Sequence, residues 1–206
     1  MSHPTPHKLS SLMMFLAGLY AGEHRKGAHD ASCALIKAAT TPMPLPLNDM
    51  PQLALDALAI DAHPGHEVIA RALPHLHWTD ASGAIAGLKP DWAAGMLVNE
   101  LIGPTGQFYH PTVRVGLYVQ QAGFHYGLRT HPAEETYILL GGRSLWGTGD
   151  DAPVQRHTGE IIHHPSVIPH QTLTRDAPLI ATWRWSGDIA YDGYAMVDSV
   201  AETATH

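Results

Sequence analysis

Hydrophobic and polar positions follow different patterns in the two halves of the chain. In the first half, apolar residues dominate the run LSSLMMFLAGLY at 9–20, and good helix formers continue at 28–39. Four prolines within 41–51 interrupt any helix there. Shorter helical candidates follow at 52–60 and 66–73. This pattern predicts several helices separated by loops.

One further helix is expected just before the character of the chain changes. Trp92, Met96 and Asn99 recur at helical spacing within 91–102, and a Gly-Pro pair follows this stretch. We therefore expect residues 1–104 to form a helical segment that packs on the structure formed by the second half.

The second half alternates in the manner of β-strands, beginning with VRVGLYVQ at 113–120. Further short strand candidates, separated by turn residues, lie at 136–140, 143–147, 160–163, 171–175 and 179–185. Many short strands at even spacing indicate a sandwich or a barrel. The sequence therefore predicts a mainly β protein whose residues 105–206 form a barrel.

Composition narrows the class of protein. A chain of 206 residues that is 45% hydrophobic can bury a sizeable core and is not a disordered chain. The formal net charge is -7 and no basic run is present, which argues against a nucleic-acid partner. Cys33 is the only cysteine, so an intrachain disulfide and a thiolate zinc cluster are both excluded. A single cysteine also suits a reducing compartment.

The apolar run at 9–21 superficially resembles the core of a signal peptide. The charge before it is weak, however, and no A-x-A site follows. The run is also too short to span a membrane. A buried helix is the favoured interpretation, so we expect a cytoplasmic protein with no membrane partner, and the periplasm is the second choice.

Two short runs contain candidate metal ligands. His131, Glu135 and Tyr137 have the same parity, so in an extended chain their side chains can point to one face. His170 lies in a second run at 159–174. Histidine and carboxylate ligate zinc, iron, manganese or nickel, and two imidazoles with one carboxylate leave positions open for a substrate. Because the chain has 16 histidines, a chance pair is the competing explanation, and the second run is what favours a site.

The spacing of these two runs resembles the two motifs of the cupin superfamily. The first motif, G-x5-H-x-H-x3-E-x6-G, corresponds to Gly123, Arg129, His131, Glu135 and Gly142, and the second, G-x5-P-x-G-x2-H, to Gly159, Pro165, Val167 and His170. The resemblance implies a cupin double-stranded β-helix barrel with an N-terminal helical segment.

Two positions depart from these motifs. Val167 replaces a turn glycine, and Arg129 replaces the first motif histidine although a guanidinium has no lone pair for a metal. Three arrangements stay open. The other motif ligands could hold a metal together with Tyr137 or water, His125 could take part, or the site could be free of metal. The first arrangement is favoured.

Finer details resemble the dimethylsulfoniopropionate (DMSP) lyases of cupin type, over about residues 90–198. The similarity lies in Tyr126, HPAEETY at 131–137, Pro169-His170 and WRWSGD at 183–188. This resemblance implies one divalent transition metal held by His131, Glu135, Tyr137 and His170. It also implies that Tyr126 lies near the substrate, and it places a substrate-orienting histidine of the family at Arg129.

The family reaction is a β-elimination that gives acrylate and dimethyl sulfide. A metal would bind the substrate carboxylate as a Lewis acid. Tyr137 or Tyr126 would then remove a proton, provided that a cation lowers its pKa from about 10. Aromatic faces suit a sulfonium, and the candidates are Trp183, Trp185, Tyr126 and Tyr191. Arg129 could bind the carboxylate in bidentate fashion, yet it would also repel the sulfonium.

Three functions therefore stay open. The favoured one is a DMSP lyase, which takes a small-molecule carboxylate as its substrate. The second is a cupin isomerase or oxygenase that acts on another small carboxylic acid, and the third is a non-enzymatic ligand-binding cupin. The exposed edges of a small barrel also leave a homodimer open.

Overall fold

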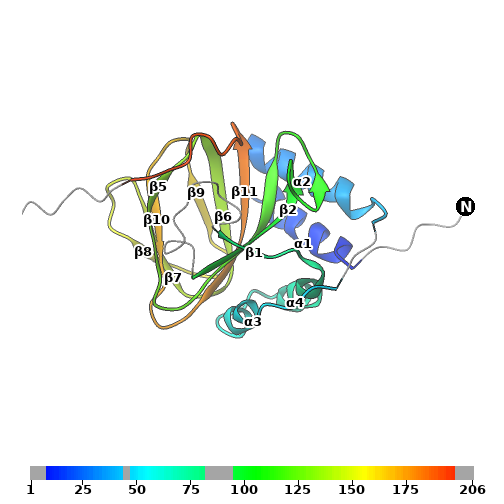
Figure 1. Cartoon of the computed structure of the whole chain (residues 1–206), viewed down its shortest axis with the longest axis horizontal. Helices are drawn as coiled ribbons and strands as arrows, with labels where there is room; N and C mark the ends of the chain where they lie inside the picture. Colours follow the sequence, from blue (N-terminus) through cyan, green and yellow to red (C-terminus); the bar gives the residue numbers. More distant parts are fainter. Residues whose placement is uncertain (1–7, 44–46, 82–94, 198–206) are drawn as a thin grey trace, which may run out of the picture.

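Helices and two facing β-sheets make up the protein (Figure 1). The structure is a computed structural model that describes residues 8–43, 47–81 and 95–197. Its helices are α1 (Ser10–Ala21), α2 (Lys26–Ala39), α3 (Gln52–Leu58) and α4 (His66–Ala72), followed by a 3-10 turn at Leu73–His75. The predicted mainly β fold with N-terminal helices is confirmed.

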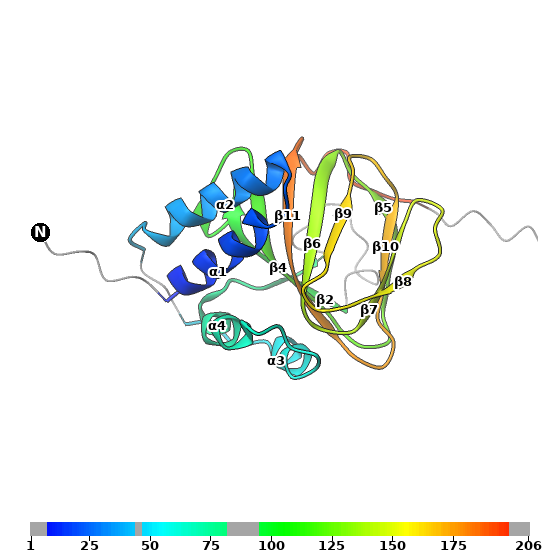
Figure 2. The same ribbon diagram turned by 180° about the vertical axis from the view of Figure 1, so that it is seen from behind.

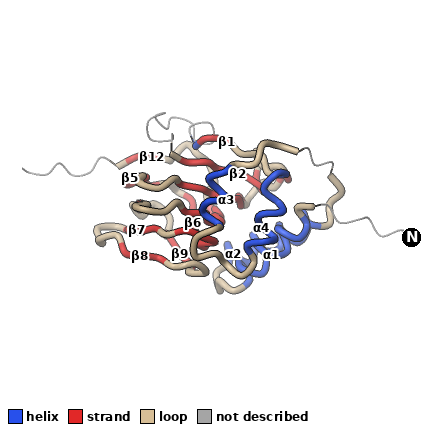
Figure 3. The backbone as a smooth tube through the Cα atoms, turned by 90° about the horizontal axis from the view of Figure 1, so that it is seen from below, coloured by secondary structure: helices blue, strands red, loops and turns tan. Residues whose placement is uncertain are grey.

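Antiparallel pairing builds both sheets, apart from the short parallel pair β2–β3. The first sheet runs in the order β1 (Thr79–Asp80), β2 (Met96–Gly103), β4 (Arg114–Gln120), β11 (Leu179–Gly187), β6 (Ala133–Gly142) and β9 (Ile161–His164), with β3 (Phe108–Tyr109) beside β2. The second runs in the order β12 (Ala195–Met196), β5 (His125–Thr130), β10 (His170–Leu173), β7 (Ser144–Thr148) and β8 (Val154–Arg156). Seen from below, the helices gather on one side of the strands, and β5, β7 and β8 lie on the far side (Figure 3).

The central strands of the first sheet are buried on both faces, which explains their largely apolar sequences. Every residue of β4 is buried. Val115, Leu117 and Val119 belong to the core beneath the helices, whereas Tyr118 belongs to a second core inside the barrel. Alternate residues of one strand therefore serve the two faces. This arrangement lets one sheet support the helices and line the interior of the barrel.

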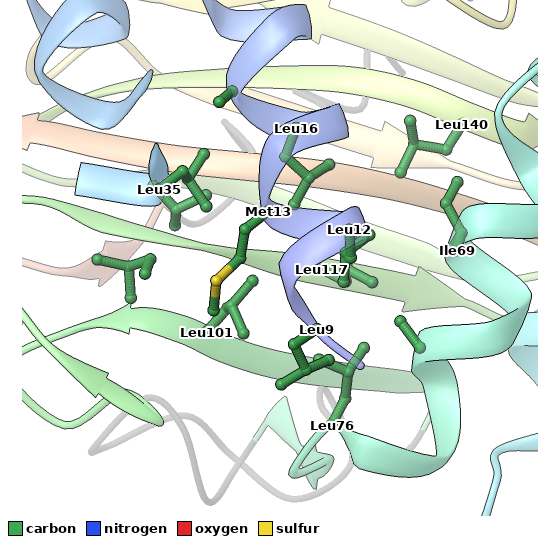
Figure 4. Close-up of a cluster of buried hydrophobic side chains, with 14 of the residues drawn as sticks. Leu9, Leu12, Met13, Leu16, Leu35, Ile69, Leu76, Leu101, Leu117 and Leu140 are labelled. Carbon is green, nitrogen blue, oxygen red and sulfur yellow. The ribbon is translucent and has the colours of Figure 1, made fainter. Parts of the chain in front are cut away.

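The helices cover the outer face of this sheet (Figure 2). The residues Leu12, Met13 and Leu16 of α1 have no exposed surface, and they lie among side chains from the other helices and the sheet, including Leu35, Ile69, Leu117 and Leu140 (Figure 4). Within the described ranges, no helix combines the length and the apolar character needed to cross a membrane.

A buried ion pair ties the connection between α1 and α2 to the sheet. The Nε atom of Arg184 donates to Oε2 of Glu23 over 2.9 Å, and neither side chain is exposed. Thr136 on β6 donates its hydroxyl to the other oxygen of Glu23 over 2.7 Å, and Nη2 of Arg184 lies 2.9 Å from Glu134. Arg184, Glu134 and Thr136 lie beside the candidate ligand Glu135 along the sheet, so the helical layer braces the strands that carry the site.

The helix predicted at 91–102 is wrong in its described part. Met96–Gly103 form the strand β2, which pairs with β4. Trp92 lies outside the described residues. Pairing with β4 overrides the local helical preference of this stretch, because β4 offers β2 a full row of hydrogen-bonding partners. The first sheet therefore begins before residue 105, while the proposed division into two domains stays a prediction.

Candidate metal centre

Three buried side chains converge inside the barrel. His131 lies in the turn between β5 and β6, Glu135 lies on β6, and His170 begins β10. One ligand atom from each lies within 4.8 Å of the other two. Oε2 of Glu135 is 3.1 Å from Nε2 of His131 and 3.0 Å from Nε2 of His170. The two sequence runs therefore meet as predicted.

Backbone carbonyls orient both imidazoles. Nδ1 of His131 lies 3.0 Å from the carbonyl oxygen of Ala133, and Nδ1 of His170 lies 3.0 Å from that of Ile168. When a ring is neutral, the nitrogen that faces a carbonyl carries the proton, and Nε2 then presents a lone pair towards Glu135. Nε2 of His170 is buried and lacks an aligned hydrogen-bond partner among the described residues. Two lone pairs and a carboxylate that face one another are a donor set suited to a divalent cation.

Electrostatics favour an ionised Glu135. Burial alone would raise the pKa of Glu135, but the charges and hydrogen bonds of His131 and His170 outweigh it and hold that pKa well below its usual range. Burial, reinforced by the nearby charge of Arg129, lowers the pKa of His170 to about 4. Metal ligands must be deprotonated, so both directions prepare the cluster for metal binding at neutral pH.

A main-chain hydrogen bond joins the two motifs. The N–H of Val167 donates to the carbonyl of His131 over 2.9 Å, and the hydroxyl of Thr130 donates to the carbonyl of Val167 over 2.8 Å. Val167 has a φ of +58°, a conformation that usually favours glycine. Val167 therefore adopts the positive φ for which the motif uses glycine, although the residue itself has changed.

His164 supports His170 from behind. The two rings stack with centroids 4.2 Å apart, and Nδ1 of His164 lies 3.2 Å from the hydroxyl of Thr148. Burial lowers the pKa of His164 to about 2, so this ring is neutral. The place of His164 beside His170 is set by the pairing of β9 with β6.

A pocket opens beside the cluster. We call it the barrel pocket. Its walls include most of the residues that the sequence selected, namely Tyr126, Arg129, His131, Glu135, Tyr137, Trp183, Trp185 and Tyr191. The sequence missed Tyr118 and Tyr194, which also line it. A concave, mostly aromatic space with a few polar groups is typical of a small-molecule site.

The tyrosines of the barrel pocket are buried and hydrogen-bonded. The hydroxyls of Tyr126 and Tyr194 share a hydrogen bond, and the hydroxyl of Tyr137 lies 3.5 Å from Nη2 of Arg129. Burial raises the pKa of Tyr126, and burial together with the charge of Glu135 raises that of Tyr137 well above the usual value. The roles predicted for Tyr126 and Tyr137 as base and metal ligand stay predictions.

His125 does not take part in the cluster. Its side chain is exposed, and Nε2 lies 2.8 Å from Oε1 of Gln171. The register between β5 and β10 shifts between Tyr126 and Arg129, because the two residues of β5 between them oppose a single residue of β10, Gln171. This bulge reverses the parity of β5, so Tyr126 faces inward and His125 faces outward.

Comparisons with known proteins agree with this geometry. Residues 28–181 match a family model described as dimethylsulfoniopropionate lyase. The dimethylsulfoniopropionate lyase DddQ of Ruegeria pomeroyi is 35% identical over 89 residues, which are 43% of this chain and 44% of that protein. The aligned part therefore spans less than half of that relative.

Solved structures share the fold. The crystal structure of DMSP lyase DddQ from Ruegeria pomeroyi DSS-3 is similar with a TM-score of 0.66 and 22% identity, over 91% of this chain and 96% of that one. A structure from a study of the DMSP lyases RdDddP and RnDddQII gives a TM-score of 0.60 and 22% identity, over 91% and 99%. At this level of identity, the likeness concerns the fold alone.

Proposed function

The chain belongs to the DMSP lyase family of cupin type, and from this premise we propose that it is a metal-dependent lyase that splits DMSP into acrylate and dimethyl sulfide. The convergence of His131, Glu135 and His170 at the edge of an aromatic pocket carries the proposal. The metal identity is not part of it, because such donors accept zinc, iron, manganese and nickel.

The proposed metal ligands are the two imidazole Nε2 atoms and Oε2 of Glu135, with Tyr137 as a fourth candidate. When bound, a divalent cation supplies Lewis acidity that makes the C–H beside the substrate carboxylate more acidic. The carbonyls of Ala133 and Ile168 keep the imidazoles turned towards the cluster. The protein thus holds its donors in place before a substrate arrives.

A tyrosine is the proposed base. Tyr137 and Tyr126 both present hydroxyls to the barrel pocket, and burial raises the pKa of each, so a nearby cation must lower it before the phenolate can act. Arg129 provides one fixed positive charge, with its Cζ 3.8 Å from the ring centroid of Tyr126. The phenolate takes the proton, the two carbons become doubly bonded, and dimethyl sulfide leaves with the electrons of the C–S bond.

The aromatic side of the barrel pocket is the proposed binding place for the sulfonium. Trp183 and Trp185 are neighbours on β11 with ring centroids 6.1 Å apart, and Tyr191 lies 5.1 Å from Trp185. A cation against such faces gains up to about 2 kcal/mol when it is desolvated. The sulfonium is a good leaving group already, so no acid is required at this end.

Headspace detection of dimethyl sulfide from purified protein and DMSP tests the proposal. The protein is stripped with a chelator and reloaded separately with zinc, ferrous iron, manganese and nickel. We expect release that depends on metal and that Glu135→Ala abolishes, whereas the exposed Glu67→Ala retains it. Absence of dimethyl sulfide at every metal load would exclude DMSP as substrate.

Arg129 favours one second candidate, an isomerase or oxygenase acting on another small carboxylic acid, because a guanidinium in the pocket attracts anions and repels a sulfonium. Oxygen consumption by the ferrous protein, measured across small acids, separates an oxygenase from an elimination. Consumption without dimethyl sulfide release would favour this alternative.

A further inference from the structure

Arg129 carries a buried charge that has no acidic partner in the described part of the chain. It is 1% exposed. Of the other buried arginines, Arg114 pairs with Glu100 over 2.6 Å and Arg184 pairs with Glu23. No described carboxylate lies within 4.0 Å of Arg129. Because burial of a charge is costly unless it is paired, this exception requires an explanation.

The hydrogen bonds that Arg129 makes are long and all involve neutral groups. Nη1 lies 3.5 Å from the carbonyl of Tyr126 and 3.4 Å from that of His170. Nη2 lies 3.5 Å from the hydroxyl of Tyr137 and 3.3 Å from that of Thr172. Good N–H···O bonds are about 2.9–3.0 Å long, so these contacts position the guanidinium without saturating it.

Glu135, the carboxylate whose charge acts on Arg129 through space, makes its close contacts elsewhere. Glu135 receives the indole N–H of Trp185 on one oxygen and faces His131 and His170 with the other. Both Glu135 and Arg129 line the barrel pocket. A carboxylate brought by a ligand would therefore be the first acidic group in close contact with Arg129.

We infer that Arg129 is the receptor for the carboxylate of the ligand and thereby sets the class and the orientation of the substrate. The planar guanidinium packs on the ring of Tyr126, with Cζ 3.8 Å from the ring centroid, and this packing limits its rotation. A fixed guanidinium matches a carboxylate with two parallel hydrogen bonds. The inference rests on the proposed function for the identity of the site, but not on the reaction itself.

The inferred substrate class is a small acid with one carboxylate and an apolar or cationic far end. The wall formed by Trp183, Trp185 and Tyr191 holds no positive side chain that faces the pocket in the described residues, since Arg114 packs on Tyr191 and pairs with Glu100. A second carboxylate would be desolvated there without a partner. Arg129 also repels a sulfonium, so DMSP can bind in only one direction, with its cation against the aromatic wall.

The receptor also acts during the elimination. As the proton beside the carboxylate leaves, negative charge spreads onto the carboxylate oxygens. A guanidinium fixed at those oxygens is aligned for this charge before it develops, which stabilises the transition state more than the bound acid. Arg129 would thus contribute to both binding and rate.

Calorimetric titration of acrylate into metal-free protein tests the inference independently of any turnover. The chelator-treated wild type should bind acrylate, and the neutral isostere acrylamide should bind at least 10-fold more weakly. Arg129→Met should weaken acrylate at least 10-fold and leave acrylamide unchanged, and Arg129→Lys should weaken acrylate because an ammonium lacks the planar fork. The matched control is Arg143→Met, which removes an exposed arginine that pairs with Asp61.

Equal binding of acrylate and acrylamide by the wild type, or acrylate binding by Arg129→Met within twofold of the wild type, would overturn the inference. Urea unfolding of each variant confirms that it is folded, and Arg129→Gln replaces Arg129→Met if the latter is not. A failure to release dimethyl sulfide from DMSP would reject the proposed function while these carboxylate titrations still decide the role of Arg129.

Discussion

The indole N–H of Trp185 donates to Oε1 of Glu135 over 2.7 Å, and this contact determines which carboxylate oxygen faces the two histidines. The residues lie opposite each other on β11 and β6. Trp185 also lies against His131, with ring centroids 4.4 Å apart. One aromatic side chain therefore orients two candidate ligands at once.

Trp185→Phe should weaken metal binding about 10- to 100-fold, as loss of a hydrogen bond to a metal ligand generally does. Phenylalanine keeps an aromatic ring near His131, so the fold should be retained. A competition titration against a zinc chelator measures the affinity. Trp183→Phe is the matched control, since the N–H of Trp183 donates to the backbone of Leu117 and not to a ligand. Equal affinities of the two variants would contradict the orienting role of Trp185.

Metal binding should stabilise the folded protein, and the effect should depend on His170. A metal at 100 times its dissociation constant adds about 2.7 kcal/mol to the free energy of unfolding. Thermal unfolding with and without zinc measures the rise in midpoint. We expect His170→Ala to abolish this rise and the exposed His157→Ala to keep it. A rise that survives in His170→Ala would place the metal elsewhere.

Glu23→Gln should destabilise the protein by about 3–5 kcal/mol, because it leaves the guanidinium of Arg184 without its fully buried partner. Urea unfolding measures the change. Glu67→Gln is the comparison, since it removes an exposed helical pair with Arg71 that is worth about 0.5 kcal/mol or less. A loss below about 1 kcal/mol in Glu23→Gln would mean that Glu134 alone satisfies Arg184.

The metal-free protein should lose stability as the pH falls below about 6.5. Burial lowers the pKa of His164 from 6.5 to about 2 and that of His170 to about 4, so the unfolded chain binds more protons than the folded one in this range. Each histidine then removes up to about 1.4 kcal/mol per pH unit from the free energy of unfolding. The loss continues down to the folded pKa of each.

The variant His164→Gln tests whether His164 causes part of this loss of stability at low pH. Urea unfolding of wild type and variant between pH 7 and 5 should show a smaller slope for the variant, because glutamine does not titrate. The free energy of unfolding of the wild type, relative to that of the variant, should therefore decrease as the pH falls. Parallel curves would show that His164 does not contribute.

The convergence of His131, Glu135 and His170 could be predicted from the sequence because their spacing reflects hairpin geometry. His131 lies just before β6 and Glu135 lies within it, and His170 follows a turn in which Val167 has the positive φ that favours glycine. Such constraints act over a few residues, so they can be recognised without knowledge of the fold.

Other features depend on contacts between distant segments and could not be predicted. The interpretation of 91–102 as a helix failed because β2 is selected by its pairing with β4. Parity favoured His125 as an inward residue, but a bulge in β5 turned Tyr126 inward instead. Tyr194 precedes a strand of only two residues, which is too short for any periodic signal.

The hydrogen bond between the main chains of Val167 and His131 has a further consequence. Because backbone atoms make it, most side-chain replacements at these two positions leave it intact, and only proline at 167 deletes the donor. The bond therefore links the turn that carries His131 to the turn that precedes His170 without depending on side chains. Replacement of Trp183, unlike that of Trp185, could thus alter which ligand the barrel pocket accepts while the backbone link between the two histidine-bearing turns is kept.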